Sequence, residues 1–146
     1  MKKFISVLFL VVLVFSLCAF PASASNTTEE IIYYEDGSYL VMTLTEPMTR
    51  ASSVRSGAKT GDYYNADGDL LWDFTVHGTF TYDGTTATAT DASYSYNIYH
   101  SAWTLKNASA YCSGDQAIAE GKFNGGLLLN RSTSISLTCS PTGVLS

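Results

Sequence analysis

The chain has 146 residues, which is enough for one globular domain with its own core. It carries 8 lysines and arginines against 13 aspartates and glutamates, for a formal net charge of −5, and the basic residues are scattered along the chain. An acidic surface without a basic patch repels phosphate backbones and anionic lipids, so the composition argues against nucleic acid as a partner.

Residues 1–24 have the pattern of a bacterial secretory signal peptide. Lys2 and Lys3 form a positively charged start, an apolar stretch runs from Phe4 to Phe20, and Ala22-Ser23-Ala24 supplies the small residues that signal peptidase requires. The alternative is an uncleaved anchor, because the apolar stretch is close to the shortest that spans a bilayer. The small-residue site favours cleavage.

Cleavage would start the mature chain at Ser25 and change its net charge from −5 to −7, because Lys2 and Lys3 leave with the signal. No lipoprotein cleavage box precedes Cys18, and the ending SPTGVLS contains no wall-sorting motif. We therefore expect a secreted protein with no stable membrane anchor. It would be released freely or retained non-covalently at the cell wall.

After residue 24 the chain is rich in Ser, Thr, Gly, Tyr and Val, and no window shows apolar residues at helical spacing. This composition is typical of all-β proteins. About eight or nine short strands separated by turn sequences predict an antiparallel two-sheet β-sandwich, Ig-like or jelly-roll-like, that follows the signal-peptide helix.

The first element expected in the mature chain is a β-hairpin over residues 25–46, closed by a turn at Asp36-Gly37. Its strands are apolar on both faces, so either the main domain or another chain must cover it. Residues 47–58 are small, polar and basic, which is typical of a linker. The β-sandwich domain is then expected to span residues 59–146.

The clearest pattern in the domain is an apolar–polar alternation from Asp69 to Tyr82, broken only by Leu71 on the polar side and Gly78 on the apolar side, which predicts a long strand with one solvated face. A two-residue loop at Asp83-Gly84 would pair this strand with the next. Continued pairing would put serines opposite buried aromatic residues, so we predict a bulge within Thr90–Ser93. The residues turned inward by this bulge would be Tyr94, Tyr96 and Ile98.

Cys112 and Cys139 are the cysteines that remain after signal cleavage. An even number of cysteines in an exported domain favours a disulfide, and we expect these two to form one. Two buried thiols are the alternative.

No recognised catalytic motif occurs in the chain, and we expect neither enzymatic activity nor a cofactor. His77 and Asp73 share the outer face of one strand, but four residues of strand separate them by roughly 13 Å. Asn65, Asp67 and Asp69 suggest a calcium loop, yet the EF-hand register fails and a hairpin turn explains the same residues. We therefore predict no catalytic, cofactor-binding or metal-ligating residue.

Aromatic side chains are the remaining candidates for binding, because the chain has ten tyrosines and two tryptophans. Aromatic rings on a β-sandwich can stack on the C–H groups of sugars. Most fall on the predicted core face. The candidates to face a ligand are Tyr63 and Tyr64, of which one should point outward because they are adjacent, and Tyr99 and Tyr111, which are out of phase with their strands.

Residues 59–146 resemble uncharacterised small secreted β-rich proteins of Gram-positive, largely gut-associated bacteria. The resemblance lies in the stretch KTGDYYNADGDLLWDFTVHGTFTYDG, in SAWTL and in the ending SLTCSPTGVLS. It implies secretion and a β-rich unit beginning at residue 59. No catalytic or binding residue is carried over.

These observations favour a secreted, non-catalytic β-sandwich that acts as a surface-interaction module with a cell-surface glycan or protein as ligand. The alternative is a bacteriocin or toxin-like protein that acts on membranes, because residues 69–99 have the alternation of a membrane-inserting hairpin. Any half-buried hairpin has the same pattern.

Overall fold

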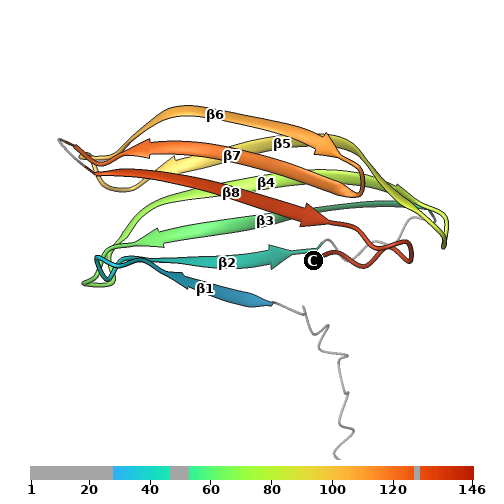
Figure 1. Cartoon of the computed structure of the whole chain (residues 1–146), viewed down its shortest axis with the longest axis horizontal. Helices are drawn as coiled ribbons and strands as arrows, with labels where there is room; N and C mark the ends of the chain where they lie inside the picture. The colour runs from blue at the N-terminus through green and yellow to red at the C-terminus, as the bar shows by residue number, and fades with distance from the viewer. Residues whose placement is uncertain (1–27, 47–52, 127–128) are drawn as a thin grey trace, which may run out of the picture.

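The computed structural model describes residues 28–46, 53–126 and 129–146, and this part of the chain is all-β. Eight antiparallel strands form two sheets (Figure 1). The first sheet contains β1 (Glu29–Tyr33), β2 (Tyr39–Thr45), β3 (Val54–Tyr64), β4 (Leu70–Tyr82) and β5 (Ala87–Ile98). The second contains β6 (Thr104–Ser113), β7 (Gln116–Asn124) and β8 (Asn130–Thr138). No helix in the described ranges is long and apolar enough to cross a membrane.

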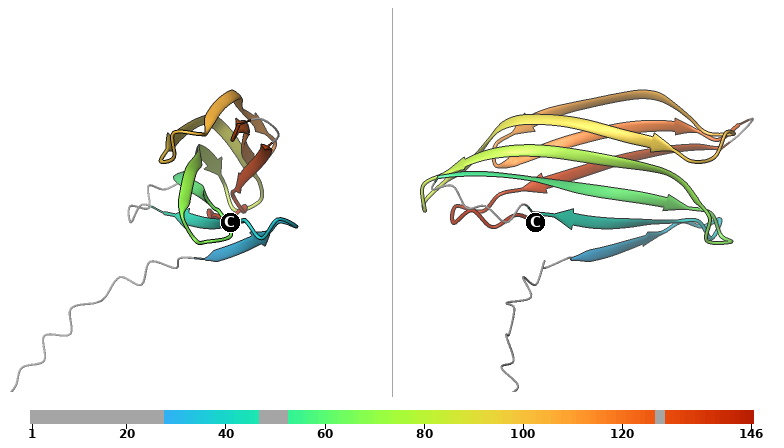
Figure 2. Two further views of the ribbon diagram at one scale, coloured as in Figure 1. Left: turned by 90° about the vertical axis from the view of Figure 1, so that its left-hand side faces the viewer. Right: turned by 180° about the vertical axis from the view of Figure 1, so that it is seen from behind.

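The two sheets face each other, and in the end-on view they curve around a common core (Figure 2). The predicted antiparallel two-sheet sandwich is confirmed. Each sheet is a meander, in which strands that are neighbours in sequence are also neighbours in space. An Ig-like or jelly-roll-like sandwich would instead distribute consecutive strands between its two sheets.

The core is built from the alternate residues of β4 that the sequence pattern placed inside. Trp72, Phe74, Val76 and Phe80 are completely buried, as the alternation from Asp69 to Tyr82 predicted. The second sheet meets them with Ala117, Ala119, Phe123, Ile135 and Leu137. The prediction of a solvated outer face was wrong for the first half of β4, because Leu71, Asp73 and Thr75 are buried there.

The predicted bulge between β4 and β5 is confirmed. The register shifts between Thr79 and Phe80, which leaves Thr90 as the extra residue on β5. Beyond the bulge Tyr94, Tyr96 and Ile98 pair with the core residues of β4, as expected. The two-residue loop predicted at Asp83-Gly84 was wrong, because the connection is longer and Ala89 lies opposite Phe80, two residues later than such a loop would place the partner. Tyr94 and Tyr96 stay partly exposed near the edge of the sheet.

The N-terminal hairpin is part of the first sheet. Strands β1 and β2 pair as predicted, and β2 continues the sheet by pairing with β3. Residues 54–58, expected in a linker, instead form the start of β3, because all of them pair with β4 and Ala58 also pairs with the end of β2. The boundary expected at residue 59 is therefore wrong. The predicted signal peptide and residues 47–52 of the expected linker lie outside the described residues.

Gly78 lies on the inner face of β4, where the two sheets approach closely. A Cβ at this position would lie 2.7 Å from the Cβ of Ala117 and 2.9 Å from the ring of Phe80. Gly78→Ala is expected to lower the free energy of unfolding by about 1–3 kcal/mol through overpacking. Urea denaturation measures this loss. Combining it with Ala117→Gly should give a cost smaller than the sum of the two single changes, whereas strict additivity would contradict the contact.

Candidate ligand-binding face

The candidate site is the face of the five-stranded sheet that points away from the core. The strand register aligns its side chains in rows that cross the sheet. One row contains Tyr33, Tyr39 and Tyr64, from β1, β2 and β3. The neighbouring row contains Ile31, Val41, Asp62, Asp73 and Asn97, from β1 to β5. An aromatic row and a mainly polar row thus lie side by side.

The tyrosine row is a continuous aromatic ridge. The rings of Tyr39 and Tyr64 stack with centroids 5.0 Å apart and an interplanar angle of 12°. Tyr33 packs against Tyr39 with centroids 5.8 Å apart. Since Tyr39 and Tyr64 cover one face of each other, Tyr33 on the edge strand offers the most open ring, at 72% exposure.

The polar row is organised around Asp73, which is buried. Its carboxylate accepts a hydrogen bond from the backbone N–H of Asn97 at 3.1 Å and from the Asn97 amide at 2.9 Å. It also accepts one from the hydroxyl of Tyr99 at 2.6 Å. This last bond raises the pKa of Tyr99, and burial adds to the effect. Asp73 therefore fixes a half-exposed tyrosine over the face.

Asp62 lies directly across the strand pair from Asp73. It is partly buried, and burial followed by the negative charge of Asp73 raises the pKa of its carboxyl. None of the hydrogen bonds among the described residues reaches its carboxylate. We call the surface formed by these side chains the tyrosine–carboxylate face; it consists of Tyr33, Tyr39, Asp62, Tyr64, Asp73, Asn97 and Tyr99.

Asp62→Asn is expected to raise the melting temperature at neutral pH. The folded protein holds the Asp62 proton more tightly than the unfolded chain, so the ionised carboxylate destabilises the fold. This penalty is fully present above the folded pKa and disappears as the pH falls below the unfolded value. Thermal melts over a pH series should show the gain at neutral pH and its loss in acid. A gain that does not change with pH would contradict this origin.

Asp83→Asn provides a matched control of opposite sign. The Asp83 carboxylate accepts backbone hydrogen bonds from Thr85 and Thr86, each at 2.8 Å, and these bonds hold its pKa below the ordinary value. The ionised form stabilises the fold above the unfolded pKa, and this contribution is lost as the pH falls through the folded pKa. Asp83→Asn should therefore lower the melting temperature at neutral pH, with a difference that shrinks in acid.

Of the tyrosines that the sequence singled out, two belong to this face. Tyr64 lies in the aromatic row, and Tyr99 is held by Asp73. Tyr63 does not face a ligand, because the alternation that turns Tyr64 outward turns Tyr63 into the core, where it is 1% exposed. Tyr111 is 43% exposed but lies on the second sheet, where its hydroxyl donates a hydrogen bond to Glu120 at 3.2 Å.

Sequence reasoning missed the other members of the face. Tyr33 and Tyr39 belonged to the hairpin that was expected to be a separate unit, so they were not placed beside Tyr64. Asp62, Asp73 and Asn97 come from three different strands. Only the pairing register brings them into one row. The one signal in the sequence was the alternation along each strand, which points these three side chains away from the core.

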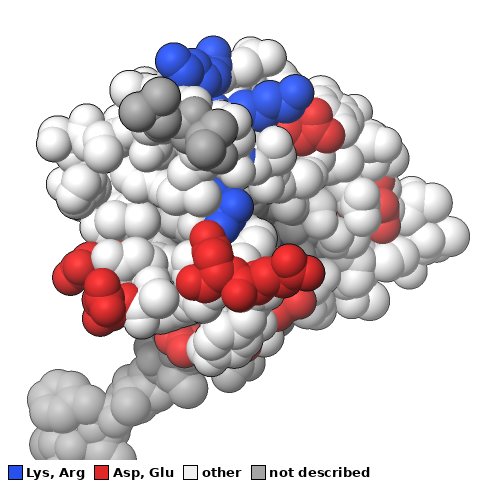
Figure 3. All heavy atoms as spheres, turned by 60° about the vertical axis from the view of Figure 1, so that its left-hand side comes forward, with Lys and Arg blue, Asp and Glu red and all other residues white. Residues whose placement is uncertain are grey.

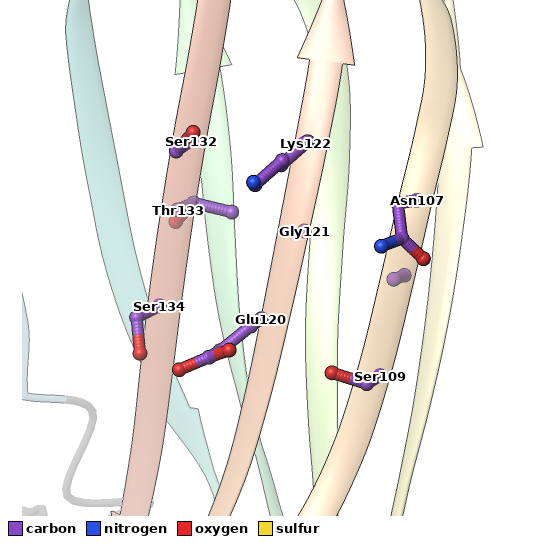
Figure 4. A pocket seen from close by; sticks show the side chains of 9 residues that line it. Asn107, Ser109, Glu120, Gly121, Lys122, Ser132, Thr133 and Ser134 are labelled. Atoms are coloured by element: carbon purple, nitrogen blue, oxygen red, sulfur yellow. The ribbon is translucent and has the colours of Figure 1, made fainter.

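A shallow polar depression lies on the outer face of the second sheet, with a volume of about 350 Å³ (Figure 4). Small side chains line most of it, and Lys122 and Glu120 on β7 both extend toward β8. The residues lining it are Asn107, Ala108, Ser109, Glu120, Gly121, Lys122, Ser132, Thr133 and Ser134. It contains no aromatic ring, so the tyrosine–carboxylate face is the better candidate for sugar stacking.

The disulfide expected between Cys112 and Cys139 is not formed, and both cysteines are free. Cys112 pairs with Ala117 of β7, and the backbone N–H of Cys139 bonds the carbonyl of Asp115, which directly precedes β7, on the side where β8 lies. One strand thus lies between them, which separates them by about 10 Å, whereas a disulfide needs Cα atoms about 4.4–6.8 Å apart. Cys112 is also exposed while Cys139 is buried.

The other polar residues considered as candidates, His77 and the Asn65–Asp69 segment, form ordinary hydrogen bonds within the sheet and within a turn. His77 hydrogen-bonds Ser95 across the sheet at 2.9 Å. The Asn65 side-chain oxygen accepts the backbone N–H groups of Asp67 and Asp69, which is the geometry of a turn. Within residues 28–46, 53–126 and 129–146, no three His, Cys, Asp or Glu side chains are grouped so that they could hold a metal ion.

Charge is distributed unevenly over the face of the molecule drawn in Figure 3. In Figure 3, most of the acidic side chains visible lie in the lower half of the molecule, and the basic ones lie at the top and centre.

No family model, no curated protein and no solved structure matches this chain.

Proposed function

We propose that this protein is a secreted, non-catalytic binding module that recognises a cell-surface glycan through the tyrosine–carboxylate face. The observation that carries the proposal is the aromatic ridge of Tyr33, Tyr39 and Tyr64 beside the carboxylates of the neighbouring row. Sugars present apolar C–H faces next to hydroxyl donors. A ridge of rings beside carboxylate acceptors complements both.

The regular pairing of the strands also fits a binding role. The rings and the polar groups are held on paired strands, so little side-chain freedom is lost when a ligand docks. Cross-strand hydrogen bonds restrain the neighbouring hydroxyls as well, such as the 2.9 Å contact between Thr60 and Thr75. Secretion, which the pattern of residues 1–24 suggests, would bring this face to glycans of the cell surface.

A glycan array probed with the purified secreted protein, followed by calorimetry on the sugars that bind, tests the proposal. Tyr33→Ala and Tyr64→Ala should each weaken binding by roughly two- to tenfold, the loss expected for one aromatic contact. Tyr111→Ala is the matched control, because it removes an exposed tyrosine from the other sheet and should leave the affinity unchanged. Binding that Tyr111→Ala weakens as much as Tyr33→Ala would contradict the proposed face.

The toxin-like alternative would require the β4–β5 hairpin to present its apolar face to lipid. That face includes Trp72, Phe74, Val76 and Phe80, all completely buried between the sheets. Insertion would therefore have to dismantle the core. We expect no leakage from neutral or anionic vesicles at micromolar protein, and dye release from either would favour the alternative.

A further inference from the structure

The face proposed to bind glycans has an unbalanced charge. Its outward-facing strand residues include Glu29, Asp62, Asp73 and Asp91. Lys59 and Arg55, the lysine and arginine in the described strands of this sheet, share the inner face with Val76 and Phe80, with which they pair. Arg55 forms its ion pair with Glu46. The outward carboxylates thus have no lysine or arginine among the described strand residues on their own side of the sheet.

The two central carboxylates, Asp62 and Asp73, differ in the hydrogen bonds that they already accept. Asp73 already accepts hydrogen bonds from Asn97 and Tyr99. Asp62, its neighbour across the strands, accepts none from the described residues. A partly buried carboxylate next to a second one is stabilised by a ligand that brings positive charge and several hydrogen-bond donors.

We infer that the tyrosine–carboxylate face selects a glycan carrying a protonated primary amine, a glucosamine-type sugar, over its N-acetylated or acidic counterparts. An ammonium group supplies three donors and a charge, whereas an N-acetyl group supplies one amide donor and no charge. A uronic acid would be repelled by Glu29, Asp62 and Asp73. This inference rests on the proposed function and names the ligand class for the same face.

The exposed tyrosine rings also favour a ligand that carries a positive charge. A cation close to the face of a tyrosine is attracted by the ring's electrons, and an exposed ring such as Tyr33 remains available for this contact. Asp62 and Tyr33 lie on strands separated by two strand spacings, about 10 Å, with β2 between them. A short oligosaccharide lying across the strands could therefore reach both the ring and the carboxylate.

Calorimetry with two matched oligosaccharides tests the inference: a hexamer of β-1,4-linked glucosamine and the hexamer of its N-acetylated form. The wild-type protein should bind the amine form about tenfold more tightly, the gain expected from one charge-assisted contact. Asp62→Asn should reduce this ratio to near unity. Tyr111→Ala should leave the ratio unchanged. Because Asp62→Asn is expected to stabilise the fold, loss of the preference would not reflect unfolding.

The other outcomes separate the two proposals. Equal binding of both hexamers that depends on Tyr33 would overturn the amine preference and leave the glycan-binding face intact. Binding of neither hexamer, together with no binding on the array, would overturn both. Hexalysine that competes with the glucosamine hexamer at equal affinity would overturn the inference in favour of a basic peptide ligand, because charge alone would then account for binding.

Discussion

Replacing Trp72 with alanine is expected to lower the free energy of unfolding by about 3–5 kcal/mol, as for other large aromatic truncations in cores. The indole is completely buried and lies between two other rings. It stacks on Tyr63 with centroids 4.7 Å apart and on Phe123 with centroids 3.9 Å apart. Because Tyr63 belongs to the first sheet and Phe123 to the second, the substitution opens a cavity between the sheets. Urea denaturation followed by circular dichroism measures the loss.

Trp72→Phe is the informative control. The indole Nε1–H is buried and has no hydrogen-bond partner among the described residues, so phenylalanine removes an unsatisfied donor while it retains a ring in the stack. We expect a much smaller loss than for alanine. If phenylalanine and alanine cost the same, ring stacking between the sheets would not be the source of the stability.

Arg131→Ala is expected to lower the free energy of unfolding by roughly 2–4 kcal/mol, from loss of a charged hydrogen bond and a cation–π contact. Arg131 on β8 donates from Nε to the buried hydroxyl of Tyr63 at 2.9 Å, and its guanidinium lies 4.9 Å from the ring centroid of Tyr34. It also forms an ion pair with Asp36 in the β1–β2 turn. One side chain thus ties the N-terminal hairpin to the second sheet.

The location of the effect distinguishes this prediction from a general loss of packing. Hydrogen exchange should accelerate first in β1 and β2, because Arg131 contacts the turn between them. Arg131→Lys keeps the charge but lacks the planar fork that reaches Tyr63 and Asp36 together, so an intermediate loss is expected. Uniform acceleration across both sheets would argue against a role in anchoring the hairpin. Since the hairpin carries Tyr33 and Tyr39, its detachment should also weaken glycan binding.

Several features of the fold could be read from local patterns. The alternation of β4 identified the buried Trp72 and Phe74, because successive residues of a strand point to opposite faces. The same parity argument predicted a bulge within Thr90–Ser93, and the register places the extra residue at Thr90. For Tyr63 and Tyr64, adjacency required opposite directions. Pattern alone did not decide which of the two was buried, and the packing of Tyr63 against Trp72 settled this.

Other features depended on which strands become neighbours. Cys112 and Cys139 had the number and setting expected of a disulfide, but β7 lies between them. The polar composition before residue 59 suggested a linker, yet residues 54–58 extend β3, where small side chains such as Gly57 fit beneath Leu145. Composition reports exposure and flexibility only on average. A strand partner far away in the sequence can override it.

By itself the sequence determined the all-β architecture, the buried face of the central strand and the need for a bulge, because these follow from a two-residue period that acts locally. It also determined the acidic character of the chain. Only the tertiary structure decided that the hairpin completes the first sheet and that the cysteines stay apart. It likewise placed Tyr33, Tyr64, Asp62 and Asp73 on one face. These outcomes depend on long-range pairing register, which sets neighbours across strands and which no single stretch of sequence specifies.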